Sequence, residues 1–109
     1  MQTKIIKTVK EWLPWFSDNE PEISEYILLN KMANFCRQQI EAGEIDKVSQ
    51  VIKIVNLIYS NGTLHEKNAI ENEFLEVLAL FEAPASLKSH LHIFPVKLKE
   101  AYLKTILEN

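Results

Sequence analysis

Cysteine, arginine, glycine and proline are all scarce in this chain. Cys36 is the only cysteine, so no disulfide can form within the chain, which is typical of a reducing compartment. Two glycines and four prolines are too few for a turn-rich all-β fold. Arg37 is the only arginine among twelve basic residues, whereas recognition of phosphate and guanine relies on arginine. These absences count against a disulfide-stabilised protein, an all-β protein and a nucleic-acid-binding protein.

Long apolar runs are also missing. The longest uninterrupted run covers residues 77–81, far short of the ~20 residues that a membrane-spanning helix requires. Residues 1–10 contain three lysines but lack the apolar stretch of a signal peptide. We therefore expect a cytoplasmic protein that does not bind a membrane.

What is present has the balance of an ordinary globular protein. Of the 109 residues, 47% are hydrophobic and 25% are charged, and the formal net charge is −3. This length predicts a single domain over residues 1–109. A small negative net charge produces no field that attracts nucleic acid or anionic lipid.

Apolar residues recur at helical spacing along the whole chain, which predicts an all-α fold. The expected architecture is a compact bundle of five to six antiparallel helices, because the predicted connections are short. The helices are expected at about residues 4–13, 21–42, 46–60, 63–82 and 95–107, with a short turn at 86–92.

Several residues punctuate these helices. Gly43 is expected to end the second helix, and Asn30 is a candidate break inside it. Thr63 and Glu66 have the spacing of a capping box, in which each side chain accepts a bond from the other's backbone N–H. Pro95 suits the first position of the last helix.

No group of residues has the spacing of a catalytic or metal site. Cys36 lies in an apolar series with Ala33 and Ile40, so we expect a buried side chain rather than a reactive thiol. His90 and His92 would point to different sides of a helix and could not bind one metal ion. With no glycine-rich phosphate loop either, we expect no cofactor, no metal and no enzyme activity.

Acidic residues gather in two stretches. Residues 11–30 contain no basic residue, and residues 61–86 contain only Lys67. The acidic residues are Glu11, Asp18, Glu20, Glu22 and Glu25 in the first stretch and Glu66, Glu71, Glu73, Glu76 and Glu82 in the second. Two interpretations stay open, a solvated rim or an anionic surface that a basic protein partner binds.

Three aromatic residues precede most of the first acidic stretch. Trp12 is expected on the core face of the first helix. Trp15 and Phe16 follow the helix stop, and they either cover the core, which we favour, or form an exposed anchor for a partner.

Residues 68–78, Asn-Ala-Ile-Glu-Asn-Glu-Phe-Leu-Glu-Val-Leu, resemble a helix of a bacterial family of small all-helical domains of unknown function. The shared pattern is Asn-x-Ile-x-x-x-Phe-Leu-Glu-x-Leu, and the resemblance covers about residues 30–105. It implies a helical fold and a bacterial cytoplasmic setting, and no particular reaction. Members of such families often resemble the immunity proteins that are encoded beside bacterial toxins.

Together these observations favour a protein-binding module, most specifically an immunity protein that inhibits a basic cognate toxin, for example a nuclease. The expected contact residues are Trp15, Asp18, Glu20, Glu22, Glu25, Glu73 and Glu76. The alternative is a helical adaptor or a self-associating domain, and a homo-oligomer stays open. A small enzyme that uses Cys36 is the least favoured hypothesis.

Overall fold

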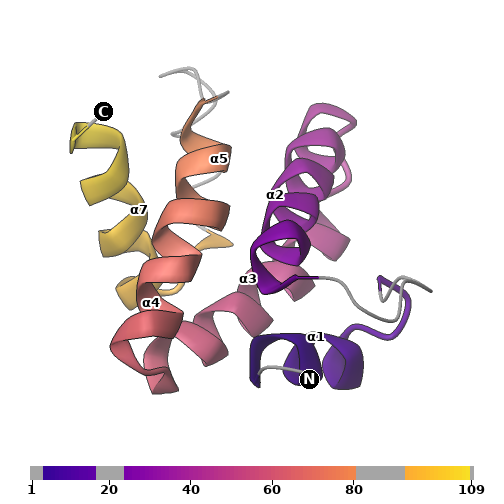
Figure 1. Cartoon of the computed structure of the whole chain (residues 1–109). Coiled ribbons are helices and arrows are strands. Elements are labelled where there is room, and N and C mark those ends of the chain that lie inside the picture. Colours follow the sequence, from indigo (N-terminus) through magenta and orange to yellow (C-terminus); the bar gives the residue numbers. More distant parts are fainter. Residues whose placement is uncertain (1–3, 17–23, 81–92, 109) are drawn as a thin grey trace.

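The computed structural model describes residues 4–16, 24–80 and 93–108, and this part of the chain contains helices and no strand (Figure 1). The helices are α1 (Lys4–Trp12), α2 (Glu25–Glu41), α3 (Ile45–Asn61), α4 (Leu64–Ile70), η1 (Glu71–Leu75), α5 (Glu76–Leu80) and α7 (Val96–Glu108). Because α4, η1 and α5 follow one another without a gap, they form one long helix. The predicted all-α fold is therefore confirmed.

The helix boundaries follow the punctuation of the sequence. Gly43 follows α2 with a φ of 79°, a left-handed conformation that glycine adopts readily. The Thr63 side chain accepts a bond from the Glu66 N–H, and the Glu66 carboxylate accepts one from the Thr63 N–H at 2.8 Å. This capping box is the predicted one. Pro95 directly precedes α7, whereas the sequence predicted it as the first residue of that helix, and its carbonyl accepts the Lys99 N–H at 2.8 Å.

Helix α2 differs from its prediction at its start and near its middle. The Ser24 side chain accepts a bond from the Tyr26 N–H, so Ser24 caps the helix, and the expected start at Pro21 lies outside the described residues. The predicted break at Asn30 is wrong. The Asn30 side chain donates to the Tyr26 carbonyl at 2.9 Å and to Glu73 at 2.6 Å, so its amide is satisfied within a continuous helix.

The long helix contains a π-helical turn at η1. There the Glu76 N–H bonds the Glu71 carbonyl, five residues earlier. A π turn adds one residue to the helix, which shifts the following side chains around its axis. Phe74 and Leu75, which lie in this turn and are neighbours in sequence, are both fully buried.

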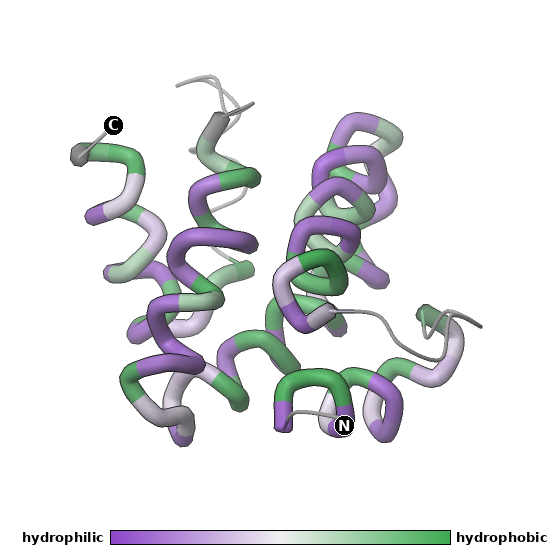
Figure 2. Tube along the Cα trace, viewed as in Figure 1, coloured by the Kyte–Doolittle hydropathy of each residue, from purple (hydrophilic) through white to green (hydrophobic). Residues whose placement is uncertain are grey.

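The core lies between α2, α3, the long helix and α7, and α1 closes one end of it (Figure 1). Figure 2 shows apolar stretches alternating with polar stretches along each helix, as amphipathic helices require. The predicted stripe of α3 is buried at Val48, Val51, Ile52, Val55 and Ile58. Among the described helices, none has the length and apolar character needed to cross a membrane.

Candidate functional site

An aromatic cluster lies where the chain leaves α1. It consists of Trp15, Phe16 and Phe35, with ring centroids 5.4 to 6.2 Å apart. The Lys47 ammonium lies 5.6 Å from the Trp15 ring centroid, a cation–π contact. Trp15 is 44% exposed, so its ring both packs on the cluster and faces solvent.

Trp12 does not lie in the core, contrary to the prediction, and is 57% exposed. Ile5, Ile6 and Val9 form the buried face of α1, and Leu13 continues it although the helix has ended. The Leu13 N–H still bonds the Val9 carbonyl as it would in a helix, so the Leu13 side chain continues the buried face of α1. Trp12 is left on the edge of the stripe, where a large ring stays in solvent.

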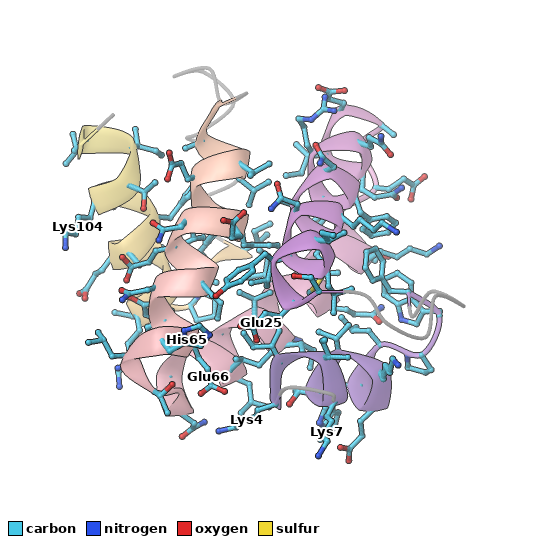
Figure 3. All side chains as sticks on the ribbon, in the orientation of Figure 1. Lys4, Lys7, Glu25, His65, Glu66 and Lys104 are labelled. Carbon is cyan, nitrogen blue, oxygen red and sulfur yellow. The ribbon has the colours of Figure 1, made fainter. Side chains whose placement is uncertain are left out.

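Glu25, in the first acidic stretch, was expected to contact a partner, but in the structure it contacts another residue of the protein. Its carboxylate is buried in the first turn of α2, and Oε1 lies 2.7 Å from Nε2 of His65 (Figure 3). The pair joins α2 to α4. Glu25 is therefore engaged in a contact within the protein, which counts against the predicted contact between Glu25 and a partner.

Asp18, Glu20 and Glu22 lie outside the described residues. Exposed apolar side chains flank this acidic segment on both sides in the sequence. Trp12 and Trp15 precede it, and Tyr26 and Ile27, which are 43% and 52% exposed, follow it. In the described part of the chain, these four are half of the large apolar side chains that are exposed.

The second acidic stretch is largely occupied by contacts within the protein. Glu66 belongs to the capping box and is buried. Glu71 accepts a bond from the Tyr59 hydroxyl, and Glu73 accepts one from Asn30, each at 2.6 Å. Glu73 and Glu76 are partly exposed, so these two predicted contact residues keep some surface. Glu82 lies outside the described residues.

Cys36 is fully buried, as predicted, and burial raises the pKa of its thiol to about 12. A thiol nucleophile needs an accessible, low-pKa sulfur, so this environment counts against the hypothesis of a cysteine enzyme. Within the described residues, no three His, Cys, Asp or Glu side chains gather as they would around a metal ion. His90 and His92 lie outside that part of the chain.

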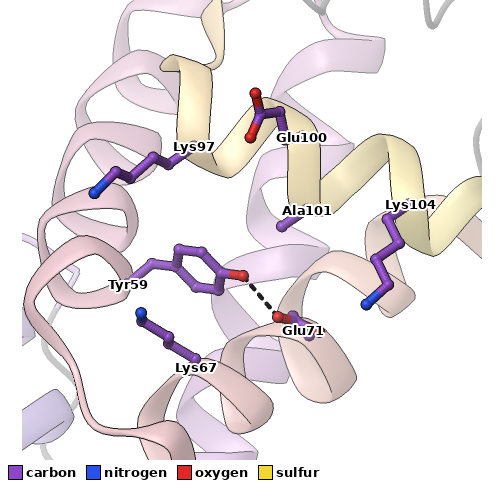
Figure 4. Close-up of a pocket in the computed structure, with 7 residues that line it drawn as sticks. All are labelled: Tyr59, Lys67, Glu71, Lys97, Glu100, Ala101 and Lys104. Carbon is purple, nitrogen blue, oxygen red and sulfur yellow. Dashed lines mark hydrogen bonds between the residues drawn. The ribbon is translucent and has the colours of Figure 1, made fainter.

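A pocket of about 400 Å³ opens between α3, α4, η1 and α7 (Figure 4). Its lining is Tyr59, Lys67, Glu71, Lys97, Glu100, Ala101 and Lys104. Burial and the adjacent Glu71, through its hydrogen bond and its charge, raise the pKa of the Tyr59 hydroxyl to about 12. We call this feature the lysine pocket. No residue of it was predicted as a site, because the pocket forms only where three separate segments meet.

Residues 4–108 match the domain-of-unknown-function family DUF7674. The chain belongs to this family. No curated protein and no solved structure matches the chain. In this DUF7674 domain, residues 68–78 lie on the long helix, and their apolar residues Ile70, Phe74, Leu75 and Leu78 are buried. That segment therefore contributes several side chains to the core of the domain.

Proposed function

We propose that this DUF7674 domain is a non-enzymatic protein-binding module, and most specifically a bacterial cytoplasmic immunity protein that inhibits a basic cognate toxin. The proposed contact residues are the exposed Trp12 and Trp15 and the acidic residues Asp18, Glu20 and Glu22 that follow them in the sequence, and we call them together the aromatic–acidic surface. The resemblance of residues 30–105 to small bacterial helical domains supports the bacterial setting.

The observation that carries this proposal is the exposure of two tryptophans that directly precede a run of acidic residues in the sequence. Trp12 and Trp15 are 57% and 44% exposed, although large aromatic rings contribute more stability when buried. Tryptophan is enriched among the residues that dominate binding energy at protein interfaces. The cost of exposing these rings is offset if a partner covers them.

Charge supports a basic partner. The segment at 17–23 contains Asp18, Glu20 and Glu22 and no basic residue, and the whole chain carries −3. An anionic surface speeds association with a basic protein and favours it over other partners. A nuclease is such a partner, because its active site must attract the nucleic-acid backbone. The partly exposed Glu73 and Glu76 add negative charge elsewhere on the molecule.

The test is capture of partners from the native lysate with tagged protein at low and at moderate salt, read by mass spectrometry. We expect one stoichiometric basic protein whose retention falls as salt screens the interaction. Recovery of the chain alone would favour the self-associating alternative instead.

The immunity role is then tested by growth. The captured protein is expressed in a host alone and together with this domain. We expect growth arrest in the first case and rescue in the second, with loss of rescue for the Trp12→Ala/Trp15→Ala variant. A captured protein that is harmless when expressed alone would contradict the immunity role while leaving the binding role intact.

A further inference from the structure

Helix α7 has apolar side chains on its outer face as well as on the face that packs into the core. Leu98 and Tyr102 are buried, whereas Val96 and Leu107 are 70% and 84% exposed. Because an α-helix turns about 100° per residue, Val96, Leu103 and Leu107 fall on one narrow stripe, opposite the buried face. Apolar residues on two sides of a helix are typical of a helix that is covered on both sides.

The outer stripe has the spacing of a contact between two helices. The residues that follow one another at intervals of four, three and four positions are Val96, Glu100, Leu103 and Leu107. We call these four residues the α7 seam. Leu103 is half-buried near the middle of the seam, and the exposed Val96 and Leu107 lie at its ends, about 16 Å apart along the helix. The seam is therefore long enough to contact about three turns of a second helix.

Two charged side chains indicate which helix fits the seam. Glu100 lies in the seam, and Lys104 lies one turn further along and on one side of it. In the part of the chain that the structure describes, neither the Glu100 carboxylate nor the Lys104 ammonium has an ion-pair or hydrogen-bond partner. Both side chains are exposed, so both are available to a second molecule.

A second copy of α7 matches these charges when it runs antiparallel to the first. In that arrangement Val96 of each copy packs on Leu107 of the other, and Glu100 of each copy meets Lys104 of the other. In a parallel arrangement Glu100 would meet Glu100 and Lys104 would meet Lys104, and contacts between like charges are unfavourable. Lys97 is exposed on the same side as Lys104 but further from the seam, so its long stem leaves the ammonium in water.

We propose that a second copy of this chain packs on the α7 seam and forms an antiparallel dimer with two-fold symmetry. Two-fold symmetry uses the same patch on both copies, so one acid and one base on each helix produce two ion pairs in the dimer. The interface is small, so we expect a dissociation constant on the order of 0.1 mM. Helices α7 and α1 lie well apart in Figure 1, so the dimer leaves the proposed partner surface at the end of α1 uncovered. The inference does not rest on the proposed function.

The first test is sedimentation velocity of the full chain at concentrations from roughly 10 µM to roughly 1 mM, which span the expected dissociation constant. We expect the sedimentation coefficient to rise from that of a monomer to that of a dimer. The variant Val96→Ser/Leu107→Ser should stay monomeric over the whole range. Both side chains are exposed in the single copy, so circular dichroism should show an unchanged fold.

The matched control is Leu57→Ser/Leu64→Ser, which removes apolar side chains that are 43% and 75% exposed on α3 and α4. This control should dimerise as the unchanged protein does. An unchanged protein that stays monomeric at roughly 1 mM would overturn the proposal, since that concentration lies well above the expected dissociation constant. Equal loss of dimer in both double variants would also overturn it, because it would show association through apolar surface of any kind.

Exchanging the charges tests the ion pairs. Glu100→Lys should weaken the dimer about fivefold, because two exposed ion pairs are replaced by two contacts between like charges. Glu100→Lys/Lys104→Glu should restore the affinity of the unchanged protein, because the two charges again meet their opposites. A double variant as weak as the single variant would contradict the pairing of Glu100 with Lys104.

Disulfide trapping tests the direction of the two helices. An equimolar mixture of the Val96→Cys and Leu107→Cys variants should form a mixed disulfide-linked dimer under mild oxidation, because these positions face each other in the antiparallel dimer. Each variant alone should form little, because its two introduced cysteines lie about 16 Å apart along the helices. The native Cys36 is buried and does not compete. Equally rapid linkage of the Val96→Cys variant with itself would overturn the antiparallel arrangement.

Discussion

At the scale of single residues, burial decides the chemistry of Cys36. Its side chain has no exposed surface, and burial raises the pKa of the thiol from 9.0 to about 12. The folded protein therefore keeps the thiol proton at pH values where an unfolded chain would lose it. This contribution to stability is complete below about pH 9 and is lost as the pH rises towards about 12.

Labelling of Cys36 checks this account. We expect a thiol reagent at mildly alkaline pH to react slowly with the native protein and rapidly after denaturation, because only the thiolate reacts. Denatured protein at the same pH is the control. Rapid stoichiometric labelling of the native protein would show an accessible thiolate and would revive the enzyme hypothesis.

Tyr59 and Glu71 give a second prediction at this scale. Tyr59→Phe should lower the free energy of unfolding by about 1 kcal/mol, because it removes one hydrogen bond and leaves a carboxylate without its donor. Glu71→Gln should lower the pKa of Tyr59 from about 12 towards 10.0, with the effect of burial remaining.

Ultraviolet titration of tyrosinate measures this pKa, with Tyr59→Phe identifying the signal of Tyr59. A late-titrating signal that is unchanged in Glu71→Gln would contradict the role of Glu71. Because the pKa is raised in the folded state, the Tyr59 contribution to stability should be lost as the pH rises from about 10 to about 12.

Residue-level predictions from the sequence succeeded where one helix determines the environment. The burial of Cys36 followed from its apolar neighbours on α2. Trp12 was misplaced because periodicity assigns both Trp12 and Leu13 to the apolar face of the helix and does not say which of the two is buried. Glu25 was misplaced because its partner His65 is forty positions away, and spacing along one helix contains no information about it.

At the scale of elements, side-chain caps set where the helices begin. Thr63→Ala should destabilise the protein by about 1 kcal/mol, because the Glu66 N–H loses its acceptor at the start of the long helix. Denaturant unfolding measures the change.

Thr105→Ala is the matched control for that variant. The Thr105 hydroxyl donates to the Ala101 carbonyl within α7, a bond that adds little to helix stability. We expect a change within about 0.5 kcal/mol. Equal losses for the two variants would contradict the capping role.

The two glycines end their helices for different physical reasons. Gly43 has a positive φ and open space around it, so Gly43→Ala should cost about 1 kcal/mol through backbone strain alone. At Gly62 an added Cβ would lie 2.6 Å from the Ile58 carbonyl oxygen, so Gly62→Ala must move backbone. We expect the larger loss of stability at Gly62, and thermal unfolding of both variants gives the order.

Helix boundaries were predictable because capping residues act locally. The π turn at η1 was not, because its residues are tied to other helices. Glu71 bonds Tyr59 of α3 and Glu73 bonds Asn30 of α2, so the contacts of this turn are tertiary. Through these contacts Glu71 and Glu73 bond to other residues of the protein, whereas the sequence alone predicted that the second acidic stretch faces solvent or a partner.

At the scale of the whole molecule, periodicity predicted the all-α fold and most of the core but not the arrangement of its surfaces. The lysine pocket joins residues 59 to 104, and only the packing of α7 on α3 and the long helix brings them together. The proposed aromatic–acidic surface depends on the sequence more than on packing, because Trp15 and the acidic run are neighbours in sequence.

The central claim is that this surface binds a basic protein. The most direct measurement is quantitative capture of the partner by three tagged proteins: the unchanged chain, Trp12→Ala/Trp15→Ala, and Leu64→Ala/Leu107→Ala. Leu64 and Leu107 are 75% and 84% exposed and lie on other helices, so the third protein controls for loss of exposed apolar surface. Circular dichroism confirms that each variant is folded. We predict that the tryptophan variant loses the partner and the leucine variant retains it. Equal capture by all three proteins would contradict the account.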